Sequence, residues 1–293
     1  MADPWRISLH GGHSGEFCEH AGGSLRSIVE AAVEAGYQTF GISEHAPRHE
    51  ERFLYDSERG KGYTTERLES EFDAYVTEAK SLADEFADHI ELLVGFESEV
   101  IPTNGYVEEA LRLRGKYQLD YQVGSVHHVG EVPLDGDLAD FERIVEESGG
   151  LEQAAVRYYD AVAEMAERMR PEVIGHLDLI RRHAPLDADL STPPIQVAAQ
   201  RTLESVAAAG SILDLNTAGW RKGLGSPYPQ PWLIERAAAM GIEFCFGDDS
   251  HNTKQVGDGI DQARTYLLEL RVNSIVTLRR GVDGIKMVAV PLD

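Results

Sequence analysis

The stretch Phe244–His251, FCFGDDSH, carries the pattern that decides the fold. An apolar, strand-like run stops there at two aspartates and a histidine. These groups are costly to bury, so a partner must offset their desolvation when they follow a buried strand directly. A bound cation meets that requirement. The stretch therefore predicts a buried strand that ends at a metal site.

Six further apolar, β-prone runs precede this one, at residues 5–9, 39–43, 90–96, 121–126, 173–175 and 212–215. Amphipathic helical patterns separate them, and several of these patterns end in glycine, as helices often do. Strands that alternate with helices predict a parallel sheet. Seven strands without a glycine-rich phosphate loop after the first favour a barrel over an open sheet.

The predicted fold is therefore α/β, a distorted (β/α)7 TIM-like barrel, with residues 1–293 forming one domain. The final stretch, GIKMVAVPLD, is expected to add a strand or to cover one end of the barrel. The long segment at about residues 48–70 follows the second run, where loops at a barrel mouth often form lids or substrate walls.

Composition excludes several classes of partner. The net charge of −23 argues against nucleic acid or an anionic membrane surface as the main partner. No apolar run is long enough to cross a membrane, and the N-terminal residues do not resemble a signal peptide. Two cysteines are too few for a disulfide framework and suit a reducing cytoplasm, so we expect a cytoplasmic protein.

Almost every predicted strand is followed by histidine or carboxylate residues. They are His10, His13, His20, Glu44, His45, Glu97, Glu99, His127, His128, His176, Asp178, Asp248, Asp249 and His251. The C-terminal ends of parallel barrel strands meet on one face. Imidazole and carboxylate groups bind Zn, Mn and Fe, so the shared position of these residues indicates a metal centre. His128, Glu99, Asp178 and Asp248 stand beside better candidates and are expected to orient the ligands.

At these residues the sequence resembles the PHP family (polymerase and histidinol phosphatase), and within it the fungal-type histidinol-phosphatases. The matching stretches occur in family order and cover most of the chain: HSGEFCEHA, ISEHAPR, LLVGFESEV, GSVHHVGEVPLD, VIGHLDLIR, NTAGWRKG, SPYP and FGDDSH. The resemblance implies a PHP-type barrel with two or three divalent metal ions, Zn, Mn or Fe.

The resemblance also implies which residues bind each ion. His10, His13, Glu97 and Asp249 would hold the first ion, and Glu97 would bridge to a second ion held by His127 and His176. His20, His45 and His251 would hold the third ion.

The sequence departs from the family at position 11. The family shows His-x-His at the end of the first strand, and Gly11 stands where its first histidine is expected. Either Gly11 and Gly12 permit a bulge that turns His10 inward, or the first ion lacks one ligand. In a regular strand, residues 10 and 13 would face opposite sides.

The resemblance predicts a metal-dependent phosphatase that hydrolyses L-histidinol phosphate in histidine biosynthesis. Glu97, Asp249 and His251 are the expected catalytic residues, with Asp249 or His251 positioning or deprotonating the attacking water or protonating the leaving alkoxide. The expected phosphate-binding residues are Arg221, Lys222, Arg181 and Arg48.

Three alternatives stay open. They are a PHP phosphoesterase for another small phosphate monoester or nucleotide, a metal-dependent hydrolase of C–N or C–O bonds, and a catalytically silent metal-binding protein. The second is disfavoured because no lysine stands at a strand end to bridge metals. Only the glycine at position 11 favours the third.

Overall fold

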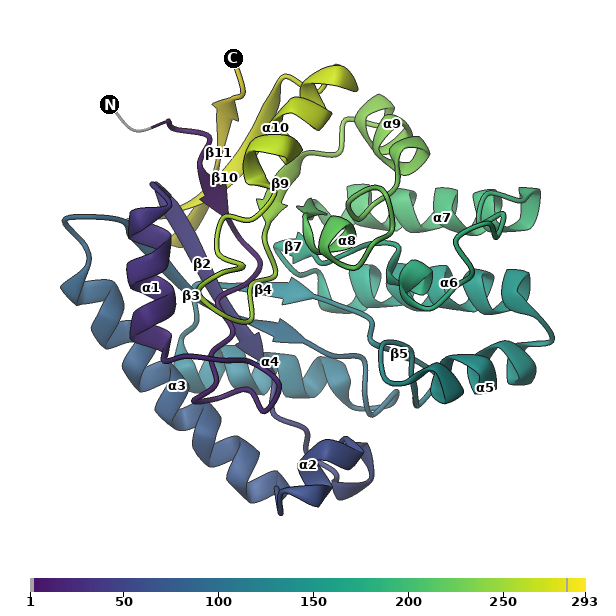
Figure 1. The fold of residues 1–293 in the computed structure, drawn as a ribbon, viewed down its shortest axis with the longest axis horizontal. Helices are drawn as coiled ribbons and strands as arrows, with labels where there is room; N and C mark the ends of the chain where they lie inside the picture. Colours follow the sequence, from purple (N-terminus) through teal and green to yellow (C-terminus); the bar gives the residue numbers. More distant parts are fainter. Residues whose placement is uncertain (1–2, 283) are drawn as a thin grey trace.

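The computed structural model describes residues 3–282 and 284–293. Seven parallel strands form one sheet, ordered as Figure 1 labels them: β1, β2, β3, β4, β7, β8 and β9. Their bounds are Ile7–Ser8, Thr39–His45, Glu91–Ser98, Tyr121–Gly124, Val173–Ile174, Ile212–Asn216 and Phe244–Gly247. Each predicted run overlaps one of these strands, which confirms the predicted parallel sheet.

The first and last strands lie side by side and nearly close the barrel. The amide of Leu9 donates to the carbonyl of Phe246 at 2.8 Å, and the amide of Asp249 donates to the carbonyl of His10 at 2.9 Å. Residues from both ends of the sequence therefore meet at the same rim.

Helices surround the barrel (Figure 1). They are α1 (Leu25–Glu34), α2 (Asp56–Gly60), α3 (Thr65–Glu85), α4 (Tyr106–Tyr117), α5 (Leu138–Ser148), α6 (Leu151–Met169), α7 (Pro193–Ala209), α8 (Ala218–Arg221), α9 (Pro231–Ala239) and α10 (Ile260–Glu269). Two 3-10 turns, Glu51–Phe53 and Leu179–Arg182, lie in the connecting segments.

Helix α1 shows how the sequence sets these elements. The side chain of Ser24 accepts a hydrogen bond from the amide of Ser27 and so satisfies a free donor of the first turn. The buried side chains of α1 recur at helical spacing and face the core: Leu25, Ile28, Val29 and Ala32.

The C-terminal residues form a hairpin outside the barrel. Strand β10 (Ser274–Gly281) pairs antiparallel with β11 (Gly284–Pro291). The expected final strand is therefore present, but its partner is a neighbouring segment that the sequence analysis did not assign as a strand. A second small hairpin joins β5 (His128–Val129) to β6 (Val132–Pro133) beside the predicted site.

A tyrosine fills the barrel interior and confines the polar groups to one end. Tyr121 is fully buried and donates its hydroxyl proton to the carbonyl of Leu9 at 2.9 Å. Gly41 and Gly95 leave room for its ring, because a Cβ atom at either position would collide with it. The interior below the strand ends is thus packed, and the chemistry is restricted to the open rim.

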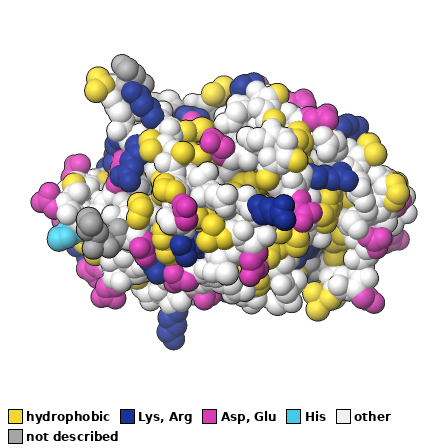
Figure 2. All heavy atoms as spheres, turned by 90° about the horizontal axis from the view of Figure 1, so that it is seen from above, with side chains coloured by type: hydrophobic (Ala, Val, Ile, Leu, Met, Phe, Trp, Pro, Cys, Tyr) yellow, Lys and Arg dark blue, Asp and Glu magenta, His cyan; other side chains and the backbone are white. Residues whose placement is uncertain are grey.

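The surface carries charges of both signs. Figure 2 shows one face on which Lys and Arg side chains stand among Asp and Glu side chains. Across the described residues, no helix combines the length and apolar character that a membrane crossing needs.

Candidate metal centre

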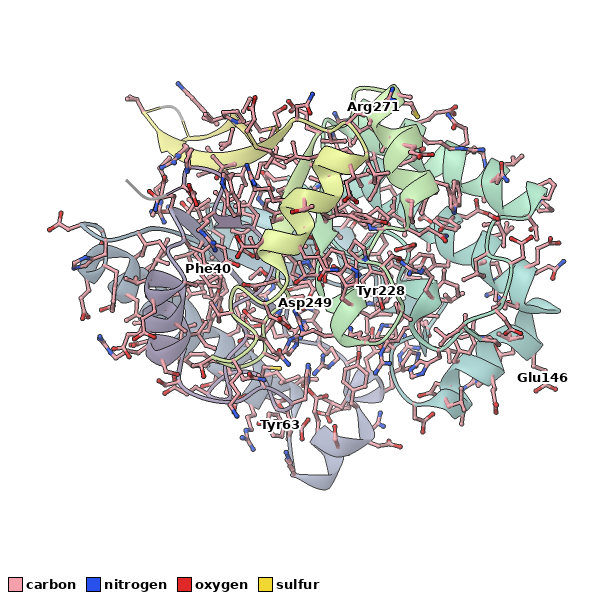
Figure 3. All side chains as sticks on the ribbon, turned by 45° about the horizontal axis from the view of Figure 1, so that its top comes forward. Phe40, Tyr63, Glu146, Tyr228, Asp249 and Arg271 are labelled. Atoms are coloured by element: carbon pink, nitrogen blue, oxygen red, sulfur yellow. The ribbon has the colours of Figure 1, made fainter. Side chains whose placement is uncertain are left out.

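The predicted histidines and carboxylates gather at the C-terminal ends of the strands, around the centre of the molecule. Figure 3 labels Asp249 in this central position, whereas Glu146 and Arg271 lie at the periphery. Most of the side chains at this rim are buried, namely His10, His13, Glu44, Glu97, His127, His176 and Asp249. They line or lie beneath a pocket of about 840 Å³.

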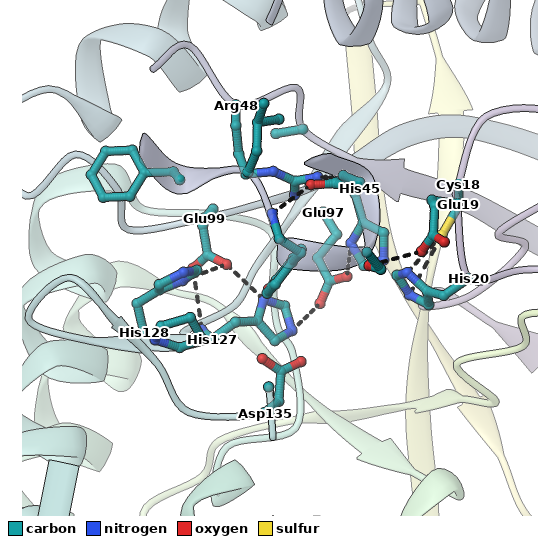
Figure 4. A pocket seen from close by; sticks show the side chains of 18 of the residues that line it. Cys18, Glu19, His20, His45, Arg48, Glu97, Glu99, His127, His128 and Asp135 are labelled. Carbon is teal, nitrogen blue, oxygen red and sulfur yellow. Dashed lines mark hydrogen bonds and ion pairs between the residues drawn. The ribbon is translucent and has the colours of Figure 1, made fainter. Parts of the chain in front are cut away.

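Glu97, at the end of β3, divides the cluster into two halves (Figure 4). Its Oε1 atom lies 3.1, 3.2 and 3.4 Å from the Nε2 atoms of His10, His176 and His127. Its Oε2 atom lies 3.0 Å from His45 Nδ1 and 3.9 Å from His13 Nε2. One carboxylate therefore faces two separate groups of imidazoles, as a bridging ligand would.

His10 points into this cluster. Its side chain is fully buried, and its Nδ1 atom lies 2.7 Å from Asp214 Oδ2. Gly11 and Gly12 permit this course of the chain, with φ of +145° and +81°. A Cβ atom on Gly11 would stand 2.5 Å from Asp248 Oδ1. The glycine and the inward histidine thus belong together, and His10 has the direction that the first of the two alternatives at position 11 requires.

Four histidines share one arrangement. In each, Nδ1 donates a hydrogen bond to an oxygen: His10 to Asp214, His13 to Glu44, His127 to Glu99 and His251 to the carbonyl of Asp249, at 2.7 to 3.1 Å. The Nε2 atom then carries a lone pair. Outer carboxylates and carbonyls orient the histidine ligands of metals in this way.

These lone pairs need a cation between them. The Nε2 atoms of His127 and His176 lie 3.1 Å apart. The Nε2 atoms of His10 and His13 and the Oε1 atom of Glu97 are buried without a hydrogen-bond partner among the described residues. Acceptors that face one another in this way are repulsive unless an ion or protons separate them. The residues therefore fit divalent ions with nitrogen and oxygen ligands.

At this rim, four sets of side chains place their donor atoms within 4.8 Å of one another. They are His10 with Glu97 and His176; His10 with His13 and Asp249; His13 with His45 and Glu97; and Cys18 with His20, His45 and His251. All nine expected ligands are in or next to these sets, His127 through its contact with His176. Cys18 is the added member, to which the sequence analysis gave no role.

Without ions, protons take their place. Burial disfavours a charged ring, but Glu97 and Asp214 outweigh it and raise the pKa of His10 well above its usual value. Burial also opposes ionisation of Glu97, yet charged His10 and His127 hold its pKa well below the usual range. Glu97 and Glu99 overcome burial to raise the pKa of His127 to about 9. Cations entering the cluster would displace these protons.

The residues expected to orient the ligands lie outside the four sets. Glu99 Oε2 is 3.0 Å from His127 Nδ1 and 3.2 Å from His128 Nδ1. Asp248 accepts from the Tyr37 hydroxyl at 2.8 Å. The sequence analysis did not assign this role to Asp214 and Glu44. Asp214 points inward from the middle of β8, where only the alternation of the strand could have indicated it.

The arginines divide by position. Arg221, Lys222 and Arg48 line the pocket, as a phosphate-binding role requires. Arg181 does not line it, and its donors are occupied by Asp178, Ser226 and the carbonyls of Pro227 and Leu224. Its neighbour Arg182 lines the pocket instead. The phosphate role predicted for Arg181 thus has no geometric basis, because the Leu179–Arg182 turn directs it into the interior.

The segment after β2 forms one wall of the pocket. Residues 52–59 contribute to its lining, including Phe53 and Tyr55. Arg48 stacks over the Tyr55 ring at 4.9 Å and pairs with Glu58. On the opposite side, Asp135 reaches the pocket from the segment after β6 (Figure 4).

The fold and the site together define a metal-dependent enzyme of the (β/α)7 barrel class. The sequence pattern of the PHP domain matches residues 10–218, and the chain belongs to the PHP domain family. A protein of Schizosaccharomyces pombe named "Probable histidinol-phosphatase" is 36% identical over 282 residues, 95% of this chain and 91% of that protein. The "Histidinol-phosphatase" of Saccharomyces cerevisiae is 28% identical over 295 residues, 89% and 88% of the two chains.

A solved structure supports the same fold. The histidinol phosphate phosphatase of Lactococcus lactis, in complex with zinc, L-histidinol and phosphate, has a TM-score of 0.72. It is 20% identical, and the similarity covers 93% of this chain and 96% of that chain. The predicted PHP-type barrel is thereby confirmed.

Proposed function

We propose that this chain is a metal-dependent phosphomonoesterase that hydrolyses L-histidinol phosphate to L-histidinol and phosphate. The observation that carries the proposal is Glu97, whose two oxygens face separate imidazole groups in a pocket that Arg182, Arg221 and Lys222 help to line. The named activities of the yeast relatives support the substrate. Zinc, L-histidinol and phosphate in the L. lactis structure support the ligand classes.

We assign three ion positions to the four sets of ligands. His10, His13, Glu97 and Asp249 would hold the first ion, and Glu97, His127 and His176 the second. His20, His45 and His251 would hold the third. The nitrogen and oxygen donors suit Zn, Mn and Fe.

The bound ions would supply Lewis acidity, which lowers the pKa of water and offsets charge on the phosphoryl oxygens. The chain's own residues fix the geometry. Asp249 has φ of +47°, and Arg221 anchors this turn by donating to the carbonyls of Asp248 and Asp249 at 2.5 and 3.0 Å. We therefore propose that Asp249 orients the attacking water. His251 acts mainly as a ligand, since its Nδ1 proton is held by the carbonyl of Asp249.

Two positively charged side chains are available for the substrate phosphate. Arg182 and Lys222 line the pocket, and neither forms an ion pair with a carboxylate within residues 3–282 and 284–293. Arg221 adds positive charge beside Asp249, although its Nη2 atom is committed to the backbone. Charge-assisted hydrogen bonds from such groups recognise phosphate oxygens. We propose that Arg182 and Lys222 contact the phosphate directly and that Arg221 positions the turn.

The acidic residues of the pocket suit the cationic end of histidinol. Asp135 lines the pocket, and its Oδ1 atom is buried without a hydrogen-bond partner among the described residues. Glu131 and Asp140 also contribute to the lining. We propose that Asp135 and Asp140 accept hydrogen bonds from the ammonium and imidazole groups, while residues 48–70 form the substrate wall of a single barrel domain. Both cysteines are free, which suits action in the cytoplasm.

The test is phosphate release from L-histidinol phosphate by protein loaded separately with Zn, Mn or Fe. Sugar, nucleotide and aryl phosphates provide the comparison. We expect kcat/KM of at least about 10⁴ M⁻¹s⁻¹ for L-histidinol phosphate and far lower values for the others. A better substrate elsewhere in the panel would overturn the assignment of L-histidinol phosphate. No release from any phosphate by fully loaded protein would overturn the phosphatase itself.

A further inference from the structure

Cys18 lies against the outer histidines of the cluster. Its Sγ atom is 3.4 Å from His20 Nδ1 and 3.5 Å from His20 Nε2, and Figure 4 shows the two side chains facing each other. The donor atoms of Cys18, His20, His45 and His251 all lie within 4.8 Å of one another. One sulfur and three nitrogens at this spacing match the four-coordinate sites that zinc prefers.

The backbone holds the sulfur in this position. The Cys18 amide donates to the carbonyl of Ser14 at 2.8 Å, and the Cys18 carbonyl accepts from the Ala21 amide at 3.2 Å. The Gly22 amide donates to the carbonyl of His251 at 2.7 Å, which ties the loop to the turn that follows β9. Cys18 is therefore fixed relative to His251, although the two are far apart in sequence.

The histidines have nitrogens to spare for an ion. His45 Nδ1 faces Glu97, while its Nε2 atom is buried and has no hydrogen-bond partner in the described part of the chain. His251 Nδ1 is held by a backbone carbonyl, so Nε2 carries the lone pair. The Nε2 atoms of His45 and His251 are both acceptors, so they cannot bind each other without an added proton or cation.

We propose that Cys18 is the fourth ligand of the ion held by His20, His45 and His251, and that it binds as a thiolate. The inference rests on the proposed metal centre and adds a sulfur ligand to it. Binding breaks the S–H bond, releases its proton to solvent and forms one metal–sulfur bond, without oxidation or reduction.

A sulfur ligand changes which metal this position selects. Thiolate favours zinc and disfavours Mn, which prefers carboxylate and water oxygens. The two positions that share Glu97 have nitrogen and oxygen donors and accept either metal. Protein exposed to both metals should therefore retain zinc selectively at the Cys18 position.

The first test is X-ray absorption on the wild-type holoenzyme loaded with zinc. We expect a Zn–S contribution at about 2.3 Å, arising from one sulfur among the bound ions. The second test is loading with cobalt, for which thiolate ligation gives an intense charge-transfer absorption in the near ultraviolet. Cys18→Ser should lose this absorption and one equivalent of zinc.

Cys245→Ala is the matched control, because Cys245 is the other buried cysteine and lies in β9, outside the four ligand sets. It should keep both the absorption and the metal content. A fully loaded wild-type protein without a Zn–S contribution overturns the proposal even if Cys18→Ser fails to fold.

The results also separate this proposal from the proposed function. Phosphatase activity without any sulfur signal refutes the thiolate and leaves the enzyme assignment intact. A sulfur signal in a protein that releases no phosphate supports the ligand and refutes the phosphatase.

Discussion

Replacement of Glu97 by glutamine is the sharpest test of the bridging role. Glu97→Gln keeps the shape of the side chain but removes its charge and one of its two equivalent acceptor oxygens. Glu97 belongs to two of the four ligand sets and, in the proposed assignment, to the first and the second ion positions. The substitution should therefore weaken two ion positions at once, which no other single ligand with a carboxylate can do.

The magnitude follows from the two contacts. Removing one electrostatic contact to a transition state costs about 3 kcal/mol in well-studied active sites. Two such losses amount to about 6 kcal/mol, and each 1.4 kcal/mol is about tenfold in rate. We expect kcat/KM for L-histidinol phosphate to fall by roughly 10⁴-fold, with metal content reduced by more than one ion per chain.

The assay combines elemental analysis of the dialysed protein with steady-state phosphate release, and circular dichroism verifies the fold. Glu99→Gln is the control, because Glu99 touches the histidines rather than an ion position. It should cost about 10- to 100-fold with most of the metal retained. If Glu97→Gln kept full metal content and more than a tenth of the activity, the bridging assignment would be wrong.

Three further predictions test other parts of the structure. Gly11→His restores the family residue, but the new Cβ atom would collide with Asp248, and the φ of +145° is strained for any residue other than glycine. We therefore expect a melting temperature several degrees lower and no added metal. The control is Gly115→Ala, which has open space around it and should be neutral or stabilising. Arg182→Ala should raise KM for L-histidinol phosphate about tenfold or more, with a smaller change in kcat. Arg181→Ala should instead lower the melting temperature. If Arg181→Ala raised KM and Arg182→Ala only lowered the melting temperature, the two roles would be reversed. Partial burial opposes ionisation of Glu69, but hydrogen bonds from Arg112 and Lys116 lower its pKa to about 2. Because the pKa of Glu69 is lower in the folded chain than its usual value of 4.5, its ionisation stabilises the fold at pH values above 4.5. This stabilisation is lost as the pH falls toward 2, the folded pKa. Urea unfolding should therefore show Glu69→Gln less stable than wild type by up to about 1 kcal/mol at pH 7, given its exposure, and equal to it near pH 2; a constant difference would contradict the argument.

The barrel strands were predictable because parallel strands are buried on both faces and read as short apolar runs. Phe244–Gly247 and Ile212–Asn216 are of this kind. The strand Ser274–Gly281 was not assigned from the sequence, although residues 275–278 are buried, because two arginines end its short apolar run.

The metal centre was partly predictable because strand ends converge whatever the helices between them do. The direction of His10 was not, since it depends on two positive φ angles that a pair of glycines permits but does not dictate. The proximity of Cys18 to His251 depends on a loop contact between distant parts of the chain. The exchange of Arg181 for Arg182 reflects the phase of a single 3-10 turn, which sequence periodicity cannot fix.

The meeting of the first and last barrel strands has a consequence for how the protein is made. His10 and Cys18 leave the ribosome before β2 is made, whereas Asp249 and His251 are synthesised only after β9, the last strand of the barrel. The amide of Asp249 reaches His10 only when β9 docks beside β1. A nascent chain can thus display the early histidines and the thiol as open, weak chelators, but the complete set of ligands exists only after all seven barrel strands have been synthesised. Correct metal loading therefore follows closure of the barrel, and it is governed by the metals available to the closed barrel rather than by those that the first strand meets.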